Sequence, residues 1–202
     1  MSVAFSTSSL PSSMVSAESP EGVIHRFAAL LEKAGIPYML TGSFASGFHG
    51  APRATQDIDI VISPNLGSLN RLLGLLSEDA YYVSRDAALD AYGRESLFNV
   101  VDYSSGWKID LICRKARSFS VTEFERRRQK ELAGVEIFVA SAEDVILAKL
   151  EWAKLSQSER QLDDAANIVR IQGGALDIVY VEKWAERLGI AEEWETVRKR
   201  AR

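Results

Sequence analysis

The chain has 202 residues, which is enough for one sizeable domain or for a domain with a small appendage. Its composition is that of an ordinary globular protein, with 47% hydrophobic and 26% charged residues. No apolar run approaches the roughly 18–20 residues that span a bilayer, so the sequence argues against a membrane protein. The net charge of −4 excludes nucleic-acid binding through overall charge. The basic triplets at 126–128 and 198–200 lie in charge-rich stretches, which favours solvated helix faces.

Residues 1–20 are predicted to form a disordered leader, because they are rich in serine and proline. They lack the basic start and the continuous apolar core of a signal peptide. The single cysteine, Cys113, excludes an internal disulfide and indicates a reducing compartment. Cys113 lies in an apolar run, so we expect a buried structural thiol. Together these features predict a cytoplasmic protein.

Helices and strands alternate over the first 140 residues. Apolar residues at spacings of three and four predict helices, and alternation or short apolar runs predict strands. In chain order these are a helix at 21–34, a strand at 36–41, a short helix at 44–49, a strand at 57–62, a helix at 65–76, an extended segment at 81–83, strands at 96–103 and 107–113, a helix at 119–132 and a strand at 135–139. Gly35 is expected to end the first helix, and residues 104–106 are expected to form a hairpin turn.

From residue 141 onward the pattern is helical. Ser141 can cap a helix, with an acid three residues later at Asp144. The helices predicted in this part are 141–154, 162–171 and 179–188. We therefore predict an α/β (α+β) protein with a core at 21–140 and a C-terminal helical subdomain at 141–202.

Two acids at a spacing of two, Asp57 and Asp59, lie in the predicted strand at 57–62. Residues i and i+2 of a strand project to the same face, so the two Cα atoms are expected about 6–7 Å apart on one side. Two adjacent anions are unfavourable unless a cation offsets them. Mg²⁺ takes oxygen ligands and shares its shell with phosphates, so the pair suits a magnesium site. An exposed strand edge is the alternative interpretation.

Two further features support a site. Gly42 and Ser43 follow a predicted buried strand and precede a short helix, where backbone N–H groups and a hydroxyl can hold a phosphate. The same pair is also common in ordinary turns. Asp110 is an acid within an apolar strand, and a buried carboxylate needs a metal or a partner. An ion pair with Lys108 or Arg114 is the alternative there.

These features occur in an order that resembles a known superfamily. Residues 40–43 (Leu-Thr-Gly-Ser) and 49–59 (His-Gly-Ala-Pro-Arg-Ala-Thr-Gln-Asp-Ile-Asp) look like the signature of the polymerase-beta-like nucleotidyltransferases. There a Gly-Ser or Gly-Gly precedes an Asp-x-Asp, and a third acid follows on a later strand. The His-Gly-x-x-Arg-x-Thr spacer and residues 143–150 (Glu-Asp-Val-Ile-Leu-Ala-Lys-Leu) resemble the bacterial abortive-infection toxin type and its uncharacterised relatives. The resemblance covers residues 36–171.

The resemblance implies a nucleotidyltransferase fold, with a small mixed sheet flanked by helices and a helical part at the C-terminus. It implies that Asp57, Asp59 and Asp110 are catalytic and ligate Mg²⁺ or Mn²⁺. Asp110 would also help to activate the acceptor hydroxyl. Gly42 and Ser43 would hold the phosphates of an NTP such as ATP. The implied chemistry is in-line attack on the α-phosphorus, with charge neutralised by the metal.

Other residues are secondary candidates for nucleotide binding. Lys149 shares a helix face with apolar residues, and in the toxin-like relatives a lysine here is thought to contact the nucleotide. A lysine whose ammonium group reaches solvent is the alternative. Arg53 is a candidate phosphate ligand, or a partner of Asp57. A late basic–acidic motif of the same relatives is matched by Arg160, Asp163 and Asp164. Their spacing also fits pairing on a helix surface.

We therefore expect a metal-dependent enzyme that moves a nucleotidyl group from an NTP to an unknown acceptor. The acceptor is RNA (including tRNA), a protein or a small molecule. The resemblance suggests a toxin–antitoxin or phage-defence component, and with it a partner protein. The alternative is a non-catalytic nucleotide-binding module, or a toxin–antitoxin partner that keeps the same fold. A third interpretation, in which the acids are structural, requires that Asp57, Asp59 and Asp110 do not converge.

Overall fold

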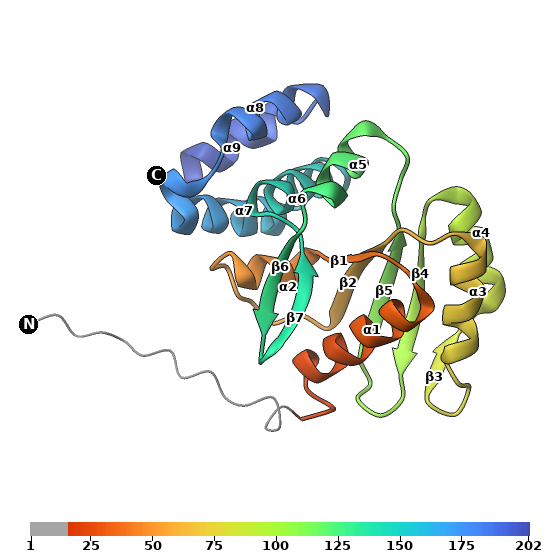
Figure 1. Cartoon of the computed structure of the whole chain (residues 1–202). Helices are drawn as coiled ribbons and strands as arrows, with labels where there is room; N and C mark the ends of the chain where they lie inside the picture. The colour runs from red at the N-terminus through yellow and green to blue at the C-terminus, as the bar shows by residue number, and fades with distance from the viewer. Residues whose placement is uncertain (1–15) are drawn as a thin grey trace, which may run out of the picture.

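The computed structural model describes residues 16–202, and residues 1–15 of the predicted leader lie outside this range (Figure 1). Over the described residues, seven strands form one mixed sheet in the order β3-β4-β5-β2-β1-β7-β6. The strands are β1 (Tyr38–Leu40), β2 (Asp57–Ile62), β3 (Tyr81–Val83), β4 (Leu97–Asp102), β5 (Lys108–Cys113), β6 (Arg128–Leu132) and β7 (Val135–Val139). At the centre β2 pairs in parallel with β5 and antiparallel with β1, which in turn pairs in parallel with β7. The remaining pairs are antiparallel.

Helices pack around this sheet, and the chain after β7 is helical. They are α1 (Pro20–Ala34), α2 (Gly42–Phe48), α3 (Leu66–Leu75), α4 (Arg85–Arg94), α5 (Ser118–Glu125), α6 (Ala142–Ser156), α7 (Glu159–Gln172), α8 (Ile178–Arg187) and α9 (Ala191–Arg200). α1 packs on α3 and α4 packs on β4, while α6 contacts α2, α7 and α8. In Figure 1, α6, α7, α8 and α9 lie together, apart from α1, α3 and α4.

Local signals set several helix ends. At the start of α1 the Ser19 hydroxyl accepts a hydrogen bond from the Gly22 N–H (3.2 Å), and Gly35 ends the helix with a φ of 71°. At the start of α6 the Ser141 hydroxyl accepts from the Asp144 N–H (3.2 Å). Such side chains replace the intrahelical acceptors that a first turn lacks, and glycine adopts the left-handed conformation without strain. The predicted boundaries at Gly35 and Ser141 are therefore confirmed.

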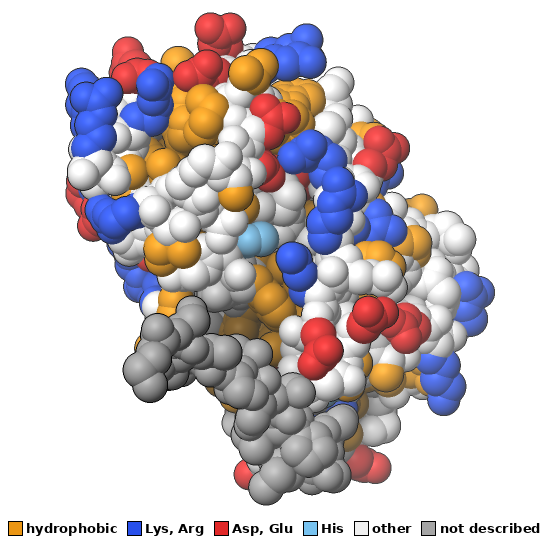
Figure 2. Space-filling view, turned by 60° about the vertical axis from the view of Figure 1, so that its left-hand side comes forward, with side chains coloured by type: hydrophobic (Ala, Val, Ile, Leu, Met, Phe, Trp, Pro, Cys, Tyr) orange, Lys and Arg blue, Asp and Glu red, His pale blue; other side chains and the backbone are white. Residues whose placement is uncertain are grey.

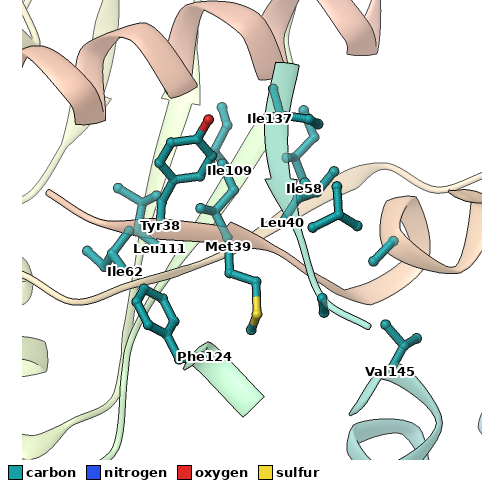
Figure 3. Packing of buried hydrophobic residues seen from close by; sticks show 14 of the residues in the cluster. Tyr38, Met39, Leu40, Ile58, Ile62, Ile109, Leu111, Phe124, Ile137 and Val145 are labelled. Carbon is teal, nitrogen blue, oxygen red and sulfur yellow. The ribbon is translucent and has the colours of Figure 1, made fainter. Parts of the chain in front are cut away.

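The central strands present one apolar and one polar face. In β2 and β5, buried residues alternate with partly exposed ones. β1 is buried on both faces: Tyr38 and Leu40 lie on one side, whereas Met39 reaches to the other, toward Phe124 of α5 (Figure 3). Because Met39 is opposite Val61 in register, and side chains alternate along a strand, Asp57 and Asp59 face the same side of the sheet as Met39.

A buried carboxylate joins α5, α6 and α8. Asp144 is 0% exposed and accepts hydrogen bonds from Arg126 Nε (3.1 Å), Ser141 Oγ (2.5 Å) and Tyr180 Oη (2.6 Å). The Arg126 guanidinium also lies over the Tyr180 ring, 3.9 Å from its centroid. A buried charge is tolerated only with such partners, so this cluster fixes how the helices pack. One hydrophobic cluster includes buried residues from both sides of residue 140, and the domain boundary predicted there stays a prediction.

Three elements differ from the sequence prediction. The helix predicted at 119–132 is wrong: α5 ends at Glu125, and β6 follows. The reason is the turn at Ala133 and Gly134, whose φ values of 46° and 85° close a hairpin with β7. The helices α4 and α9 were not predicted. Their buried residues are few, Ala88 and Ala91 in α4 and Trp194 and Val197 in α9, so they give a weak periodic signal.

Arginines of both basic triplets form ion pairs. They are Arg126 with Glu143 and Asp144, Arg198 with Glu182 and Glu195, and Arg200 with Glu159 and Asp163. Acidic, basic and apolar side chains are interspersed over the face shown in Figure 2. Cys113 is buried, as expected, and burial raises the pKa of its thiol to about 11, which disfavours the reactive thiolate. Within residues 16–202, no helix is long and apolar enough to cross a membrane.

Glu123 of α5 generates a prediction about pH dependence. Burial, followed by the charge of Asp144, raises the pKa of Glu123 from 4.5 to about 8. Between these values the folded protein holds a proton that the unfolded chain has lost, so the free energy of unfolding falls as pH rises, by up to about 1.4 kcal/mol per unit. Because glutamine cannot ionise, we expect the Glu123→Gln variant to lack this decline. The difference in free energy of unfolding, variant minus wild type, should therefore grow as pH rises to about 8 and stay constant above it.

Urea unfolding followed by circular dichroism at several pH values between 5 and 9 measures this effect. The control is Glu78→Gln, at an exposed position on the loop before β3, which should follow the wild type. A Glu123→Gln curve parallel to that of the control would contradict the assignment.

Candidate active site

The predicted acids come together on one face of the central strands. In the parallel pair β2–β5, Asp57 lies opposite Lys108 and Asp59 lies opposite Asp110. Neighbouring strands are roughly 4.8 Å apart, and residues in register project to the same face. Asp57, Asp59 and Asp110 therefore converge. The interpretation in which the acids are purely structural required that they do not.

Lys108 holds two of these carboxylates together. Its Nζ lies 3.2 Å from Asp57 Oδ1 and 3.3 Å from Asp110 Oδ2. Burial opposes the charged ammonium, but the hydrogen bond to Asp57 and the charge of Asp110 outweigh it, so the pKa of Lys108 is raised. The other oxygen of Asp110, Oδ1, accepts a hydrogen bond from the Asn99 amide on β4. Of the two partners considered for Asp110, the structure thus shows Lys108, whereas Arg114 bonds to Ser63.

Asp59 carries a shifted pKa because of its surroundings. Burial raises its pKa, and the charges of Asp110 and Asp57 add to the effect, while Lys108 and Lys149 act in the opposite direction. The Asp59 carboxylate packs directly on Gly42: a Cβ atom at Gly42 would lie 2.0 Å from Asp59 Oδ2. Gly42 also has a φ of 63°, which other residues rarely adopt. Glycine is thus required at this position both for the backbone and for the carboxylate.

The turn at Gly42 brings the start of α2 to the acids. The Thr41 N–H donates to the Asp59 carbonyl oxygen (2.9 Å), which fixes the turn against β2. The Thr41 side chain makes no capping hydrogen bond to the first turn of α2, where Ser43 is buried. N–H groups at a helix start that lack a side-chain cap are available to an oxygen of a ligand.

A second cluster links α6, α7 and the loop before β2. Lys149 is 4% exposed, and its Nζ donates to Asp164 Oδ2 (2.9 Å) and Gln161 Oε1 (3.2 Å). Arg53 Nε donates to the same Asp164 oxygen (2.9 Å), so Arg53 does not pair with Asp57. Burial lowers the pKa of Lys149, although Asp164 opposes this effect. A lysine that reaches solvent is therefore the wrong description of Lys149.

Asp164 is the partner shared by both of these basic groups, and Asp163 pairs instead with Arg200 on the surface. Helix-surface pairing thus describes Asp163 but not Asp164.

Two open hollows of about 410 Å³ each are lined in part by Asp57. The first is lined by Arg53, Ala54, Thr55, Gln56, Asp57 and Arg160. The second is lined by Thr55, Gln56, Asp57, Ser105, Gly106, Trp107 and Lys108. The indole of Trp107 packs edge-on against Phe44 of α2, with ring centroids 5.9 Å apart. Residues 55–57 thus line both hollows, one of which has two guanidinium groups and the other an indole and an ammonium group.

The chemistry of the acids suits a hard divalent cation. Among residues 16–202, no group of three or more acidic, histidine or cysteine side chains has the spacing of a preformed metal site. The contacts are consistent with this: one oxygen of Asp57 and one of Asp110 contact Lys108, and the other Asp110 oxygen accepts from Asn99. Three carboxylates on adjacent strands, two of which already share the Lys108 ammonium group, are nevertheless the donor set that Mg²⁺ takes. The three acids fit such an ion once the Lys108 ammonium group moves away from Asp57 and Asp110.

Sequence reasoning did not single out Asn99 or Gln161, and it treated Lys108 only as a partner of Asp110. Asn99 lies opposite Asp110 in the β4–β5 hairpin, and Lys108 lies two residues before Asp110 on the same face. Once the hairpin turn is placed, both relations can be derived from strand alternation. Gln161 reaches Lys149 from another helix, and no local signal predicts that contact.

Comparison with known proteins bears on the fold. No protein-family description matches the sequence, and no curated protein sequence matches it. The solution structure of the antibiotic-resistance factor ANT(2'')-Ia has a TM-score of 0.56 and 14% identity, covering 87% of this chain and 96% of that chain. The lincomycin-bound lincosamide adenylyltransferase LnuA has a TM-score of 0.53 and 13% identity, covering 76% and 98%. A nucleotidyltransferase-like protein from Paracoccidioides brasiliensis has a TM-score of 0.52 and 15% identity, covering 90% and 94%.

These likenesses extend over nearly the whole of each solved chain, so the protein has the nucleotidyltransferase fold. The fold predicted from the Gly-Ser, Asp-x-Asp and later strand acid is confirmed. At these identities the likeness is one of architecture, and the chemistry must be argued from the residues of this chain.

The contact between Gly42 and Asp59 leads to a prediction. We expect Gly42→Ala to lower the free energy of unfolding by about 1–3 kcal/mol, because a Cβ there is strained at positive φ and meets the carboxylate. Gly74→Ala is the matched control. Gly74 lies in α3, and nothing lies within 4 Å of its Cβ position, so that change should stabilise the fold by about 0.5–1 kcal/mol. Urea unfolding of both variants measures the contrast, and equal effects would refute it.

Proposed function

We propose that the chain is a metal-dependent nucleotidyltransferase that moves a nucleotidyl group from an NTP to an acceptor hydroxyl. The observation that carries the proposal is the convergence of Asp57, Asp59 and Asp110 beside the Gly42 turn on a nucleotidyltransferase fold. A likeness to ANT(2'')-Ia and to the adenylyltransferase LnuA supports the class of reaction. The fold alone serves many acceptors, so the acids are the stronger argument.

The metal would be held by the three carboxylates. Asp57, Asp59 and Asp110 supply the oxygen ligands that Mg²⁺ or Mn²⁺ prefers. When bound, the ion supplies charge neutralisation at the phosphates. The raised pKa of Asp59 reflects burial and two neighbouring anions, and a cation bound there would relieve that repulsion.

The reaction exchanges one P–O bond for another. The acceptor oxygen forms a bond to the α-phosphorus as the bond from the α-phosphorus to the α–β bridging oxygen breaks, and pyrophosphate leaves with that bonding pair. The proton of the acceptor hydroxyl passes to the Asp110 carboxylate. Asn99 donates a hydrogen bond to Asp110 Oδ1 and so positions this carboxylate as the base.

Basic groups around the acids would bind the triphosphate. Arg53 and Arg160 line the same hollow beside Asp57, which gives it two guanidinium groups for phosphate oxygens. Lys149 is held beside the acids by Asp164, and its charge acts on Asp59. The uncapped first turn of α2, at Gly42 and Ser43, adds backbone N–H donors. Positioning of this kind supplies most of the rate in phosphoryl-type transfer.

The proposal leaves the class of acceptor open among RNA (including tRNA), protein and small molecule. Because NTPs are the donors, the cytoplasm is the proposed compartment. The resemblance of residues 143–150 to the abortive-infection toxin type motivates a toxin–antitoxin or phage-defence role, with a partner protein, as part of the proposal.

Labelling with radioactive NTPs tests this function. Purified full-length protein is incubated with Mg²⁺ or Mn²⁺, cell extract, and each NTP labelled at either the α- or the γ-phosphate. Relative to extract alone, we expect the added protein to move the α-label into one acceptor (RNA, protein or a small molecule) and the γ-label into pyrophosphate alone. Asp59→Asn and Asp110→Asn should each lower transfer by at least about a hundredfold, because charge stabilisation in the transition state is lost.

Asp59→Asn should remain folded, because the raised pKa of Asp59 means that the folded state favours its neutral form. Thermal unfolding of this variant should therefore not begin earlier than that of the wild type. Asp79→Asn, at an exposed position on the loop before β3, is the control and should keep full transfer.

Transfer that persists in both site variants would refute the assignment. NTP binding measured by calorimetry, without transfer into any fraction, would instead support the non-catalytic nucleotide-binding or partner module. The ion pairs of Lys108 with Asp57 and Asp110 are the observation that favours that second candidate.

A further inference from the structure

The position of Lys108 has a consequence for the proposed metal site. Its ammonium group is a positive charge located between carboxylates of two different strands, 3.2 Å from Asp57 Oδ1 and 3.3 Å from Asp110 Oδ2. The second Asp110 oxygen already accepts a hydrogen bond from Asn99. Both oxygens of Asp110 are therefore in use within the protein itself.

We propose that Lys108 is an internal competitor of the divalent cation, whose ammonium group must leave Asp57 and Asp110 before those carboxylates can bind metal. This inference rests on the proposed function, because it takes the three acids as the metal ligands. It adds that the chain carries its own counterion for the metal-free state, and that metal affinity is set partly by the displacement of that counterion.

Electrostatics explains why a counterion is needed. Three carboxylates on adjacent strands repel one another, and such a cluster is unfavourable without a cation. Lys149 cannot balance them alone, because its ammonium group is bonded to Asp164 and Gln161. Lys108 therefore stabilises the metal-free fold, and for the same reason it weakens the binding of any other cation.

The surroundings of Lys108 leave room for its side chain to move away from the acids. Its side chain is 40% exposed and lines the second hollow with Ser105, Gly106 and Trp107. A lysine side chain is long and flexible, so the ammonium group can turn into this hollow while the backbone pairing of β5 with β2 is kept. Displacement of the side chain thus requires no change in the sheet.

Metal binding by charge-changing variants tests the inference. Mn²⁺ binding is measured by electron paramagnetic resonance on the full chain without nucleotide. We expect Lys108→Met to bind Mn²⁺ roughly two- to thirtyfold more tightly than the wild type, which corresponds to the loss of two partly exposed ion pairs. Lys108→Arg, which keeps the charge, should bind within about twofold of the wild type. Lys183→Met, on the exposed surface of α8, is the control and should leave the affinity unchanged.

Thermal unfolding gives a second readout. In EDTA, Lys108→Met should unfold at a lower temperature than the wild type, because the acids lose their counterion. Saturating Mn²⁺ should raise its unfolding temperature by more than it raises that of the wild type, because tighter binding to the folded state gives a larger shift. Adding Asp59→Asn to Lys108→Met should abolish Mn²⁺ binding, which locates the ion at the acids.

A measurement on the unmodified protein avoids any folding defect of the variants. Acetic anhydride acetylates free lysine amines, and mass spectrometry of peptides reports each site. Acetylation of Lys108 should accelerate when Mn²⁺ is added, while that of Lys183 should not. Equal Mn²⁺ affinities for the wild type and Lys108→Met, with no change in acetylation, overturn the inference and leave the proposed function standing. If neither protein binds Mn²⁺ without nucleotide, the inference falls, and the labelling experiment decides the proposed function separately.

Discussion

Repulsion among three carboxylates is the constraint on which the centre of this protein depends. Strand β2 supplies two acids on one face, and its parallel neighbour β5 supplies the third in register with Asp59. A core of isoleucine and leucine on the opposite face keeps the two strands together, so the acids cannot separate without loss of that core. The surrounding residues therefore offset the charge: Lys108 bridges two of the acids and Asn99 binds one of them. Stability and site are thus set by the same pair of strands.

Much of the fold can be predicted because its signals are local. Gly35 and Ser141 mark helix ends through their own backbone and side-chain chemistry, and alternation along β2 gives its two faces. The segment after Glu125 could not be predicted in this way. Its charged residues suit a helix, but pairing with β7 across the Ala133–Gly134 turn makes it a strand, and such pairing is not encoded in spacing within the segment. The helices α4 and α9 were missed because each buries only two side chains, which gives little hydrophobic periodicity.

In the candidate site, too, the features set by local spacing could be predicted and those set by long-range packing could not. That Asp57 and Asp59 share a face follows from a period of two. Asp110 is identifiable as an acid within an apolar strand, and the nucleotidyltransferase resemblance supplies its expected role. The proximity of Asp110 to Asp59 depends on the parallel register of β2 and β5, which sequence spacing alone does not set. The link from Arg53 through Asp164 to Lys149 joins a loop to two helices that are far away in the chain. Helix spacing explains Asp163 on the surface but not the inward position of Asp164, which follows from how α7 packs on α6.

The edge strand β6 bears on how the protein behaves at high concentration. It ends the sheet on one side, and its residues from Arg128 to Glu131 are all exposed and mostly charged. Unpaired N–H and C=O groups along a sheet edge invite strands from other molecules, and charged side chains there oppose such pairing. At the other end, β3 has only three residues and offers little length for an added strand. Both margins of the sheet thus resist intermolecular β-pairing, which protects the chain from aggregation while its central strands carry the chemistry.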